Sequence, residues 1–332
     1  MKKVYYTINI IVALGLISCY ILPYLNPSEF PVLSLMTLTT PIWIILNLFF
    51  LIFWLLKSPK KITLSILIAL LSIPLILRQF QPNNKEIQTG ALGIELMTYN
   101  VRLFNLYSWE SDGNTDDNMY QFIQDKNPDL LVLQEFYDDP KVIINYPNHY
   151  KKITQGKHGI GQIIYSKYPI IHSGSLNFTN SSNNAIFIDV LIQKDTLRVY
   201  NLHLESFRLN PQSLNFDEES SKSLLKRFNK SFQMQAQQTE KILKHSKDLN
   251  YPYIIAGDFN NTPYSFIYRE FSKTTSDAFL EVGSGFGKTY DFLFPMRIDY
   301  VLGHPSVKFN SYKEFEEEYS DHYPVLTEFQ LP

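Results

Sequence analysis

Two polar side chains stand directly behind an apolar run in the second half of the chain. The run 253–256 is followed at once by Gly257, Asp258, Phe259 and Asn260. A buried strand and a turn would account for the run and the glycine, and Asp and Asn are common turn residues. A turn does not account for an acid and an amide two residues apart at the carboxyl end of a strand. On this stretch alone a turn is still the commoner explanation, so the rest of the chain has to decide.

The same arrangement recurs along the chain, where a polar side chain closes or interrupts an apolar strand. The further sites are Asn100 in "TYN", Glu135 in "VLQE", His203 in "NLHL", Asp299 in "RIDY", and Asp321 with His322 in "SDHYP". Hydrolysis of a phosphate ester needs neutralised phosphoryl oxygens, an activated water and protonation of the leaving oxygen. One or two carboxylates suffice to hold Mg²⁺, which prefers oxygen ligands. The residue types therefore suit metal-assisted hydrolysis.

In order along residues 92–332, these motifs resemble the endonuclease/exonuclease/phosphatase superfamily, which has the DNase I-like fold. The motifs are "TYNV", "QE", "YSKYP", "NLHL", "GDFN", "RIDYVL" and "SDHYP". The resemblance implies an α/β fold in which two packed mixed β-sheets are flanked by helices. The strand-like runs outnumber the helical ones and many are apolar on both faces, which favours the same two-sheet architecture.

The resemblance also implies a metal site. It makes Glu135 the first metal ligand, with Asn100 close by and Asp321 as a further candidate. The implied ion is Mg²⁺, with Mn²⁺ as a substitute. A glutamate directly after the apolar run "DLLVLQ" is poorly explained as a surface acid or a helix cap.

The remaining motif residues are implied to handle water and phosphate. In the family, the aspartate of "GDFN" orients or deprotonates the attacking water and the asparagine binds a phosphoryl oxygen, which assigns these roles to Asp258 and Asn260. His322 would contact the scissile phosphate, with Asp299 hydrogen-bonded behind it. His203 resembles the branch that contains DNase I, inositol-phosphate phosphatases and bacterial sphingomyelinases, where a histidine faces the phosphate.

The charge of the chain is distributed unevenly. The whole chain has 30 basic and 32 acidic residues, and residues 1–78 hold six of the basic residues and one acid, so residues 79–332 carry a net charge of −7. Nonspecific binding of nucleic acid depends mainly on Lys and Arg. This balance counts against a potent nuclease.

Three apolar runs without charged residues lie near the amino terminus: Val4 to Leu22, Phe30 to Leu56, and Ile62 to Leu77. As a single helix the second run would be about 40 Å long, enough to cross a bilayer core of about 30 Å. A signal peptide would not be followed directly by two further apolar runs. We therefore predict about three transmembrane helices, through which the chain would contact the lipid bilayer.

Positive residues predict how these helices are oriented. Lys2 and Lys3 precede the first run and three lysines lie within 57–61, whereas the loop 23–31 has no Lys or Arg. The positive-inside rule then places the amino terminus in the cytoplasm and residues 79–332 outside it, with Arg78 as a mild objection. The prediction is a multi-pass membrane protein with an extracytoplasmic catalytic domain.

The predicted organisation is a membrane segment over 1–78, a linker over 79–91 and a catalytic domain over 92–332. Within the domain, helices are expected at 116–126 and 218–248. Strands are expected at 94–101, 129–135, 161–170, 185–192, 197–204, 253–260, 297–303 and 323–330.

The predicted function is a membrane-anchored, metal-dependent phosphoesterase that works by in-line attack of water. Its phosphoester substrate is left open among a lipid headgroup, a small phosphoester and nucleic acid. The alternatives are a nuclease, and a binding module that kept the fold and lost the chemistry. The sequence indicates no protein partner.

Overall fold

The computed structural model describes residues 2–82, 93–109, 115–138, 144–154, 159–207, 218–292 and 294–332. The predicted linker 79–91 therefore lies mostly outside the described residues. The chain forms two compact units. The first comprises residues 1–80, 207–237 and 261–270, and the second comprises 81–206, 238–260 and 271–332.

The amino-terminal helices of the first unit are α1 (Lys2–Ile21), α2 (Pro31–Thr37), α3 (Thr40–Lys57) and α4 (Thr63–Gln79). The short helices η1 (Leu22–Tyr24) and η2 (Pro59–Lys61) join them. By length and apolar composition, the helices over Lys2–Tyr24 and Thr40–Lys57 could cross a membrane, whereas the apolar helix α4 is shorter. The sequence predicted one long helix over Phe30 to Leu56, and this is wrong. The run is divided between α2 and α3, because Pro41 lies in the first turn of α3, where proline starts a helix.

The segment 261–270 packs with these helices inside the first unit. Tyr264 is 2% exposed and belongs to a cluster with Leu16 and Leu75. The guanidinium of Arg78 donates to the carbonyl oxygen of Pro263 at 3.3 Å. The segment that follows "GDFN" is thus held by the amino-terminal helices.

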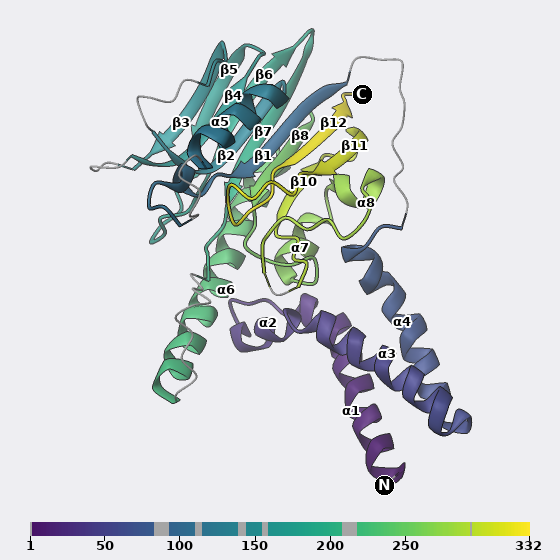
Figure 1. Cartoon of the computed structure of the whole chain (residues 1–332). Helices are drawn as coiled ribbons and strands as arrows, with labels where there is room; N and C mark the ends of the chain where they lie inside the picture. Colours follow the sequence, from purple (N-terminus) through teal and green to yellow (C-terminus); the bar gives the residue numbers. More distant parts are fainter. Residues whose placement is uncertain are drawn as a thin grey trace. The chain divides into compact units, whose positions relative to one another are not determined.

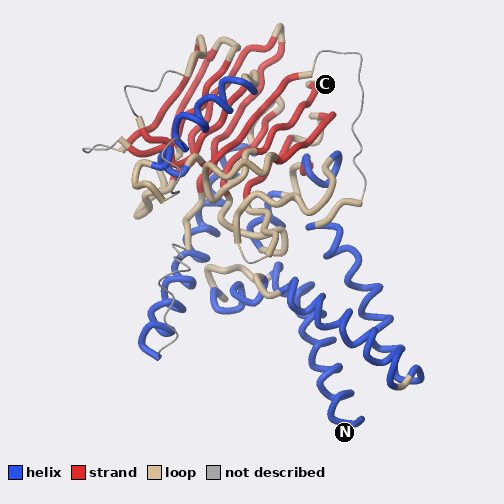
Figure 2. Tube along the Cα trace, viewed as in Figure 1, coloured by secondary structure: helices blue, strands red, loops and turns tan. Residues whose placement is uncertain are grey.

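The second unit contains two six-stranded sheets, seen as the red strands in Figure 2. In spatial order, the first sheet is β11 (Lys308–Glu314), β12 (Val325–Gln330), β1 (Ile94–Asn100), β2 (Leu130–Tyr137), β4 (Ile160–Ser166) and β3 (Asn148–Ile153). The second sheet is β5 (Ile170–Ser175), β6 (Asn184–Ile192), β7 (Asp195–His203), β8 (Tyr253–Asp258), β10 (Asp299–Gly303) and β9 (Ser276–Asp277). In each sheet one central pair is parallel, β1 with β2 and β7 with β8, and the other pairs are antiparallel. The predicted two-sheet α/β fold is confirmed.

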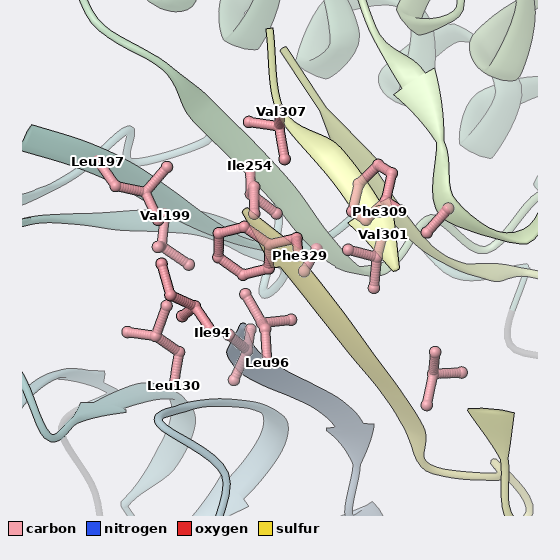
Figure 3. Close-up of a cluster of buried hydrophobic side chains, with 14 of the residues drawn as sticks. Ile94, Leu96, Leu130, Leu197, Val199, Ile254, Val301, Val307, Phe309 and Phe329 are labelled. Carbon is pink, nitrogen blue, oxygen red and sulfur yellow. The ribbon is translucent and has the colours of Figure 1, made fainter. Parts of the chain in front are cut away.

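A single apolar core lies between the two sheets. Ile94 and Leu96 of β1 pack with Val199 of β7 and Ile254 of β8, as Figure 3 shows. Buried aliphatic side chains stabilise a fold by about 1.5–3 kcal/mol each. The core therefore fixes how the two sheets face each other, and with it the groups at their ends.

Helices cover the outer faces of both sheets. Helix α5 (Thr115–Lys126) lies across the first sheet in Figure 1, where Met119 and Ile123 pack with Leu131 of β2. On the second sheet, His245 in the last turns of α6 (Glu218–Lys247) shares a hydrogen bond of 2.8 Å with the hydroxyl of Tyr200. The helices expected at 116–126 and 218–248 are thus present.

The remaining elements are the short helices η3 (Arg102–Asn105), α7 (Phe266–Phe271) and α8 (Ala278–Val282). The strand predicted over 161–170 is too long: β4 ends at Ser166, and Ile170 begins β5, which lies in the other sheet. "SKYP" makes the turn between them, since Pro169 cannot donate to a strand ladder.

Candidate active site

At one end of the sandwich the inner faces of both sheets change from apolar to polar. Every second side chain of a strand faces the same way, so the row that contains Val199 continues to His203, and the row that contains Ala256 continues to Asp258. Asn100 ends the equivalent row in β1. The apolar runs closed by polar residues in the sequence therefore correspond to inward-facing rows of side chains that end in polar groups. The carboxyl ends of the parallel strands bring the three side chains together.

A bulge in β2 directs Glu135 toward the same end. The pairing of β2 with β4 shifts between Leu133 and Phe136, so that Gln134 and Glu135 stand opposite the single residue Gln162. Leu133 and Phe136 both pack on the outer cluster under α5. Glu135 adopts a φ of 47° and its amide neighbour Asn100 donates to its Oε1 at 3.3 Å. The extra residue thus turns Glu135 away from the outer face.

Asp258 lies at the centre of the group and is 1% exposed. Its Oδ2 accepts from Nδ2 of Asn100 and from Nδ2 of Asn260, both at 3.1 Å. Its Oδ1 accepts from the backbone N–H of Asn260 at 2.7 Å, and Asn260 also donates to the carbonyl oxygen of Leu204. These bonds fix the direction of both carboxylate oxygens.

His322 is paired with Asp299 behind it. Nδ1 of His322 lies 3.0 Å from Oδ2 and 3.2 Å from Oδ1 of Asp299. The backbone N–H of Asp299 donates to Oγ1 of Thr289, and the ring of Tyr290 lies 4.9 Å from the imidazole, centroid to centroid. The pair leaves Nε2 of His322 directed to Asp258, at 3.7 Å from its Oδ2.

His203 presents a nitrogen to the same point. Its Nε2 lies 3.6 Å from Oδ2 of Asp258 and 3.7 Å from Oε1 of Glu135, both beyond hydrogen-bonding distance. This Nε2 is buried and has no hydrogen-bond partner among the residues that the structure describes. A buried polar atom without a partner is costly and often awaits a ligand. The spacing leaves His203 able to bind an oxygen that lies between these groups.

The pKa values of these residues are moved in opposite directions. Burial raises the pKa of Asp258 to about 7, against the attraction of His322. Burial would lower the pKa of His322, but the carboxylates of Asp299 and Asp258 raise it to about 10. Burial, together with His322, lowers the pKa of His203 to about 3. A base near neutral pH thus stands beside an imidazolium and a neutral imidazole, which is an arrangement typical of acid–base chemistry.

The site contains more acids than bases, which suits a cation. Its charged side chains are the carboxylates of Glu135, Asp258, Asp299 and Asp321 and the cations of Arg102 and His322. Burial raises the pKa of Glu135, and Asp321 adds to this shift. A bound divalent cation would offset both the desolvation of the Glu135 carboxylate and its repulsion by Asp321.

Two ligand sets can be formed from these residues. Asp258, Asp299 and His322 each offer a ligand atom, and these atoms lie within 4.8 Å of one another. In this set, however, His322 already binds Asp299. The second set is built around Glu135. This residue fits an oxygen-preferring ion better, because its carboxylate faces the site and its side chain is 35% exposed.

The other two predicted ligands are engaged elsewhere. The amide oxygen of Asn100 accepts from the backbone N–H of Arg102 at 3.1 Å, so its Nδ2 faces the carboxylates of Glu135 and Asp258. Asp321 lies 3.4 Å from Nε of Arg102. All eight predicted site residues gather at one end of the sandwich. The assignment of Asn100 and Asp321 to the metal remains a prediction.

Several supporting residues were missed from the sequence. Thr289 lies in the glycine-containing stretch "GSGFGKT", and its hydroxyl accepts from the backbone N–H of Asp299. Ser320 donates to the carbonyl oxygen of Asn100 at 2.9 Å and accepts from the backbone N–H of His322. Nothing in a lone serine or threonine signals such a role. Their position beside a motif was the one available clue.

Comparison with known families decides the identity of the second unit. The sequence model of the Endonuclease/Exonuclease/phosphatase family matches residues 97–322, which is more than half of the chain. The chain belongs to this family. Its members hydrolyse phosphoester bonds, and the family match spans every predicted site residue from Asn100 to His322. A domain of unknown function matches residues 2–79.

Solved structures of the endonuclease/exonuclease/phosphatase fold agree with the architecture. One such protein from Bacteroides vulgatus is 19% identical, with 73% of this chain and 100% of that chain covered and a TM-score of 0.55. A humanized TDP2 of D. rerio is 17% identical, with 72% and 99% covered and a TM-score of 0.53. The human Nocturnin catalytic domain is 13% identical, with 72% and 95% covered and a TM-score of 0.52. No curated protein is significantly similar in sequence.

Proposed function

We propose that the chain is a membrane-anchored, metal-dependent phosphoesterase of the endonuclease/exonuclease/phosphatase family. The observation that supports this most is the meeting of two histidine nitrogens around Oδ2 of Asp258. Nε2 of His203 and Nε2 of His322 lie 3.6 Å and 3.7 Å from this oxygen, too far for direct hydrogen bonds. Distances of this kind suit an intervening water or phosphoryl oxygen.

In this proposal Asp258 takes a proton from the attacking water. A base with a pKa near the working pH is the most efficient, and burial holds the pKa of Asp258 at about 7. The hydrogen bonds from Asn100 and Asn260 aim its carboxylate. As the oxygen–phosphorus bond forms, the ester bond on the opposite side of phosphorus breaks and the leaving oxygen takes a proton from solvent water, to which Asp258 later returns the proton it accepted.

The negative charge of the phosphoryl group is met by the two histidines, and Asn260 would join them by giving up one of its two donor bonds, to Asp258 or to Leu204. His322 remains protonated because Asp299 supports its imidazolium, so its Nε2–H donates to a phosphoryl oxygen. His203 provides its unpartnered Nε2. Glu135 and Asp321 would hold Mg²⁺ or Mn²⁺, and Asn100 would join them by turning its amide oxygen away from the N–H of Arg102. Such an ion supplies further neutralisation of phosphoryl charge.

We propose a lipid headgroup or a small phosphoester as the substrate and a nuclease as the less favoured alternative. The acidic residues exceed the basic ones by seven over 79–332. Binding of nucleic acid draws on the opposite balance. The apolar helices over Lys2–Tyr24 and Thr40–Lys57 support an anchored chain. In this proposal the shorter apolar helix α4 crosses as well, because only a third crossing takes the catalytic domain out of the cytoplasm when the lysines of 57–61 lie inside it.

The test uses the full chain in detergent with bis-p-nitrophenyl phosphate, Mg²⁺ or a chelator. We expect hydrolysis that depends on the metal and falls by about 10²–10⁴-fold in Asp258→Asn. Asn310→Ala is the control, because Asn310 is a buried strand residue bound to Glu328 and has no contact with the site. Equal inactivity of wild type and Asp258→Asn across metals and phosphoesters would support a binding module instead. Vesicles with sphingomyelin or phosphatidylinositol phosphates, compared with DNA, would then separate the substrate classes.

A further inference from the structure

A polar network crosses the otherwise apolar core just beneath the active site. Four side chains from both sheets form it, and each is at most 3% exposed: Thr98, Gln134, Gln162 and Asn201. Buried polar groups are costly unless they are hydrogen-bonded, and the Oε1 atoms of Gln134 and Gln162 have no partner among the described residues. Their arrangement centres on Asn201.

Asn201 uses its whole hydrogen-bonding capacity within this network. Its Nδ2 donates to the carbonyl oxygens of Leu133 at 2.7 Å and Ile163 at 2.9 Å. Its Oδ1 accepts from Nε2 of Gln134 at 2.9 Å and from Nε2 of Gln162 at 3.1 Å. An asparagine amide has two donors and two acceptor positions. No part of this amide is left for another ligand.

All four partners of Asn201 belong to the bulge that contains Glu135. Leu133 and Ile163 form the last regular pair before the bulge, and Gln134 and Gln162 are the residues on either side of it. The contact also joins the sheets, because Asn201 belongs to β7, two residues before His203, whereas the bulge lies between β2 and β4. One amide therefore holds the four ladder residues on one side of Glu135, whereas the pair Phe136 and Gly161 follows on the other side.

The bulge needs such support. Glu135 has a φ of 47°, a left-handed conformation that residues other than glycine adopt at a cost. Without the extra residue, the alternation of β2 would place Glu135 on the outer face with Leu131 and Leu133. A loss of the bulge would thus remove the carboxylate from the site while the core remained apolar and packed.

We propose that Asn201 is a positioning residue that holds the β2 bulge and thereby sets the place of Glu135 for metal binding. The inference rests on the proposed role of Glu135, but it concerns a residue that touches neither metal nor substrate. Residues that orient metal ligands typically change metal affinity or activity by about 10–100-fold when they are removed. Asn201 should show this signature.

The experiment measures Mn²⁺ binding to the full chain in detergent, by the loss of the free Mn²⁺ signal in electron paramagnetic resonance. We expect Asn201→Ala to weaken Mn²⁺ binding by about 10–100-fold, and to raise by a similar factor the Mg²⁺ concentration for half-maximal hydrolysis. Glu135→Gln should abolish the tight Mn²⁺ site. Asn310→Ala, a buried asparagine of β11 outside the network, should bind Mn²⁺ as the wild type does.

Wild-type Mn²⁺ affinity in Asn201→Ala would overturn the inference, as would a wild type that binds no Mn²⁺. If Asn201→Ala does not fold, Gln162→Met decides, because it removes one donor to Asn201 and leaves both carbonyl bonds in place. It should weaken binding in the same direction, and unchanged affinity would again overturn the inference. Metal binding that depends on Asn201 without hydrolysis of any phosphoester would refute the proposed function and support the positioning role.

Discussion

Replacing Gly257 by alanine should remove most of the activity by moving Asp258. Gly257 has a φ of +137°, and a Cβ added there would stand 2.1 Å from the carbonyl oxygen of Leu202. Leu202 and Gly257 are partners in the parallel pair of β7 and β8, and the next partners along that pair are His203 and Asp258. The clash therefore lies one residue away from two groups of the site.

The magnitude follows from the distance. Non-bonded carbon contacts are most favourable near 3.5 Å, so β7 and β8 would have to separate by about 1 Å or more. A misplacement of about 1 Å can lower a rate by about 10²-fold. The backbone strain costs about 1–3 kcal/mol and the overpacking about as much again, so the free energy of unfolding should fall by about 2–6 kcal/mol.

The assay compares kcat and thermal unfolding of Gly257→Ala with those of Gly285→Ala. Gly285 also has a positive φ, +71°, but nothing lies within 4 Å of the added Cβ. This control adds backbone strain without a clash, so it should lose stability and keep its kcat. A wild-type kcat in Gly257→Ala would refute the reasoning, because a backbone carbonyl cannot rotate away as a side chain can.

Three further outcomes are expected. Asp299→Asn should lower kcat by about 10²-fold or more, because the imidazolium of His322 loses its carboxylate; steady-state hydrolysis measures this, and an unchanged kcat would contradict it. Mg²⁺ at a hundred times its Kd should raise the free energy of unfolding of the wild type by about 2.7 kcal/mol, which is measured as a higher unfolding temperature. Glu135→Gln should abolish this rise. Asp189→Asn should cost about 3–5 kcal/mol at neutral pH and leave the kcat of the folded fraction unchanged, because it leaves Arg198 buried without its partner. Burial raises the pKa of Asp189, but the hydrogen bonds from Arg198 outweigh this effect and lower the pKa. The loss of unfolding free energy in Asp189→Asn should therefore be present above about pH 4 and vanish as the pH falls through the lowered pKa. Urea unfolding at about pH 7 and about pH 2 tests this.

The sequence predicted the parts of the site that follow from strand periodicity. His203 and Asp258 stand at the end of apolar rows, and the row pattern is visible in the chain itself. The two-sheet fold could be predicted for the same reason. The short helices and edge strands could not: β3, for example, is polar and largely exposed, so it offers no apolar alternation.

The direction of Glu135 could not be predicted from periodicity. Its position in the alternation of β2 assigns it to the outer face, and the bulge that turns it inward depends on Asn201, more than sixty residues away in the sequence. The break between α2 and α3 was also missed, although Pro41 marks it. Long-range hydrogen bonds and local proline effects thus account for the main differences.

The contact between residues 261–270 and the amino-terminal helices bears on how this protein should be handled. A truncated protein that starts after residue 80 would strip Tyr264 of its apolar partners and Pro263 of the guanidinium that binds its carbonyl, three residues after Asn260. A loss of activity in such a fragment would reflect damage to that segment as well as the absence of the amino-terminal helices. Exchanging the amino-terminal module with that of another family member would require residues 261–270 to be moved together with it.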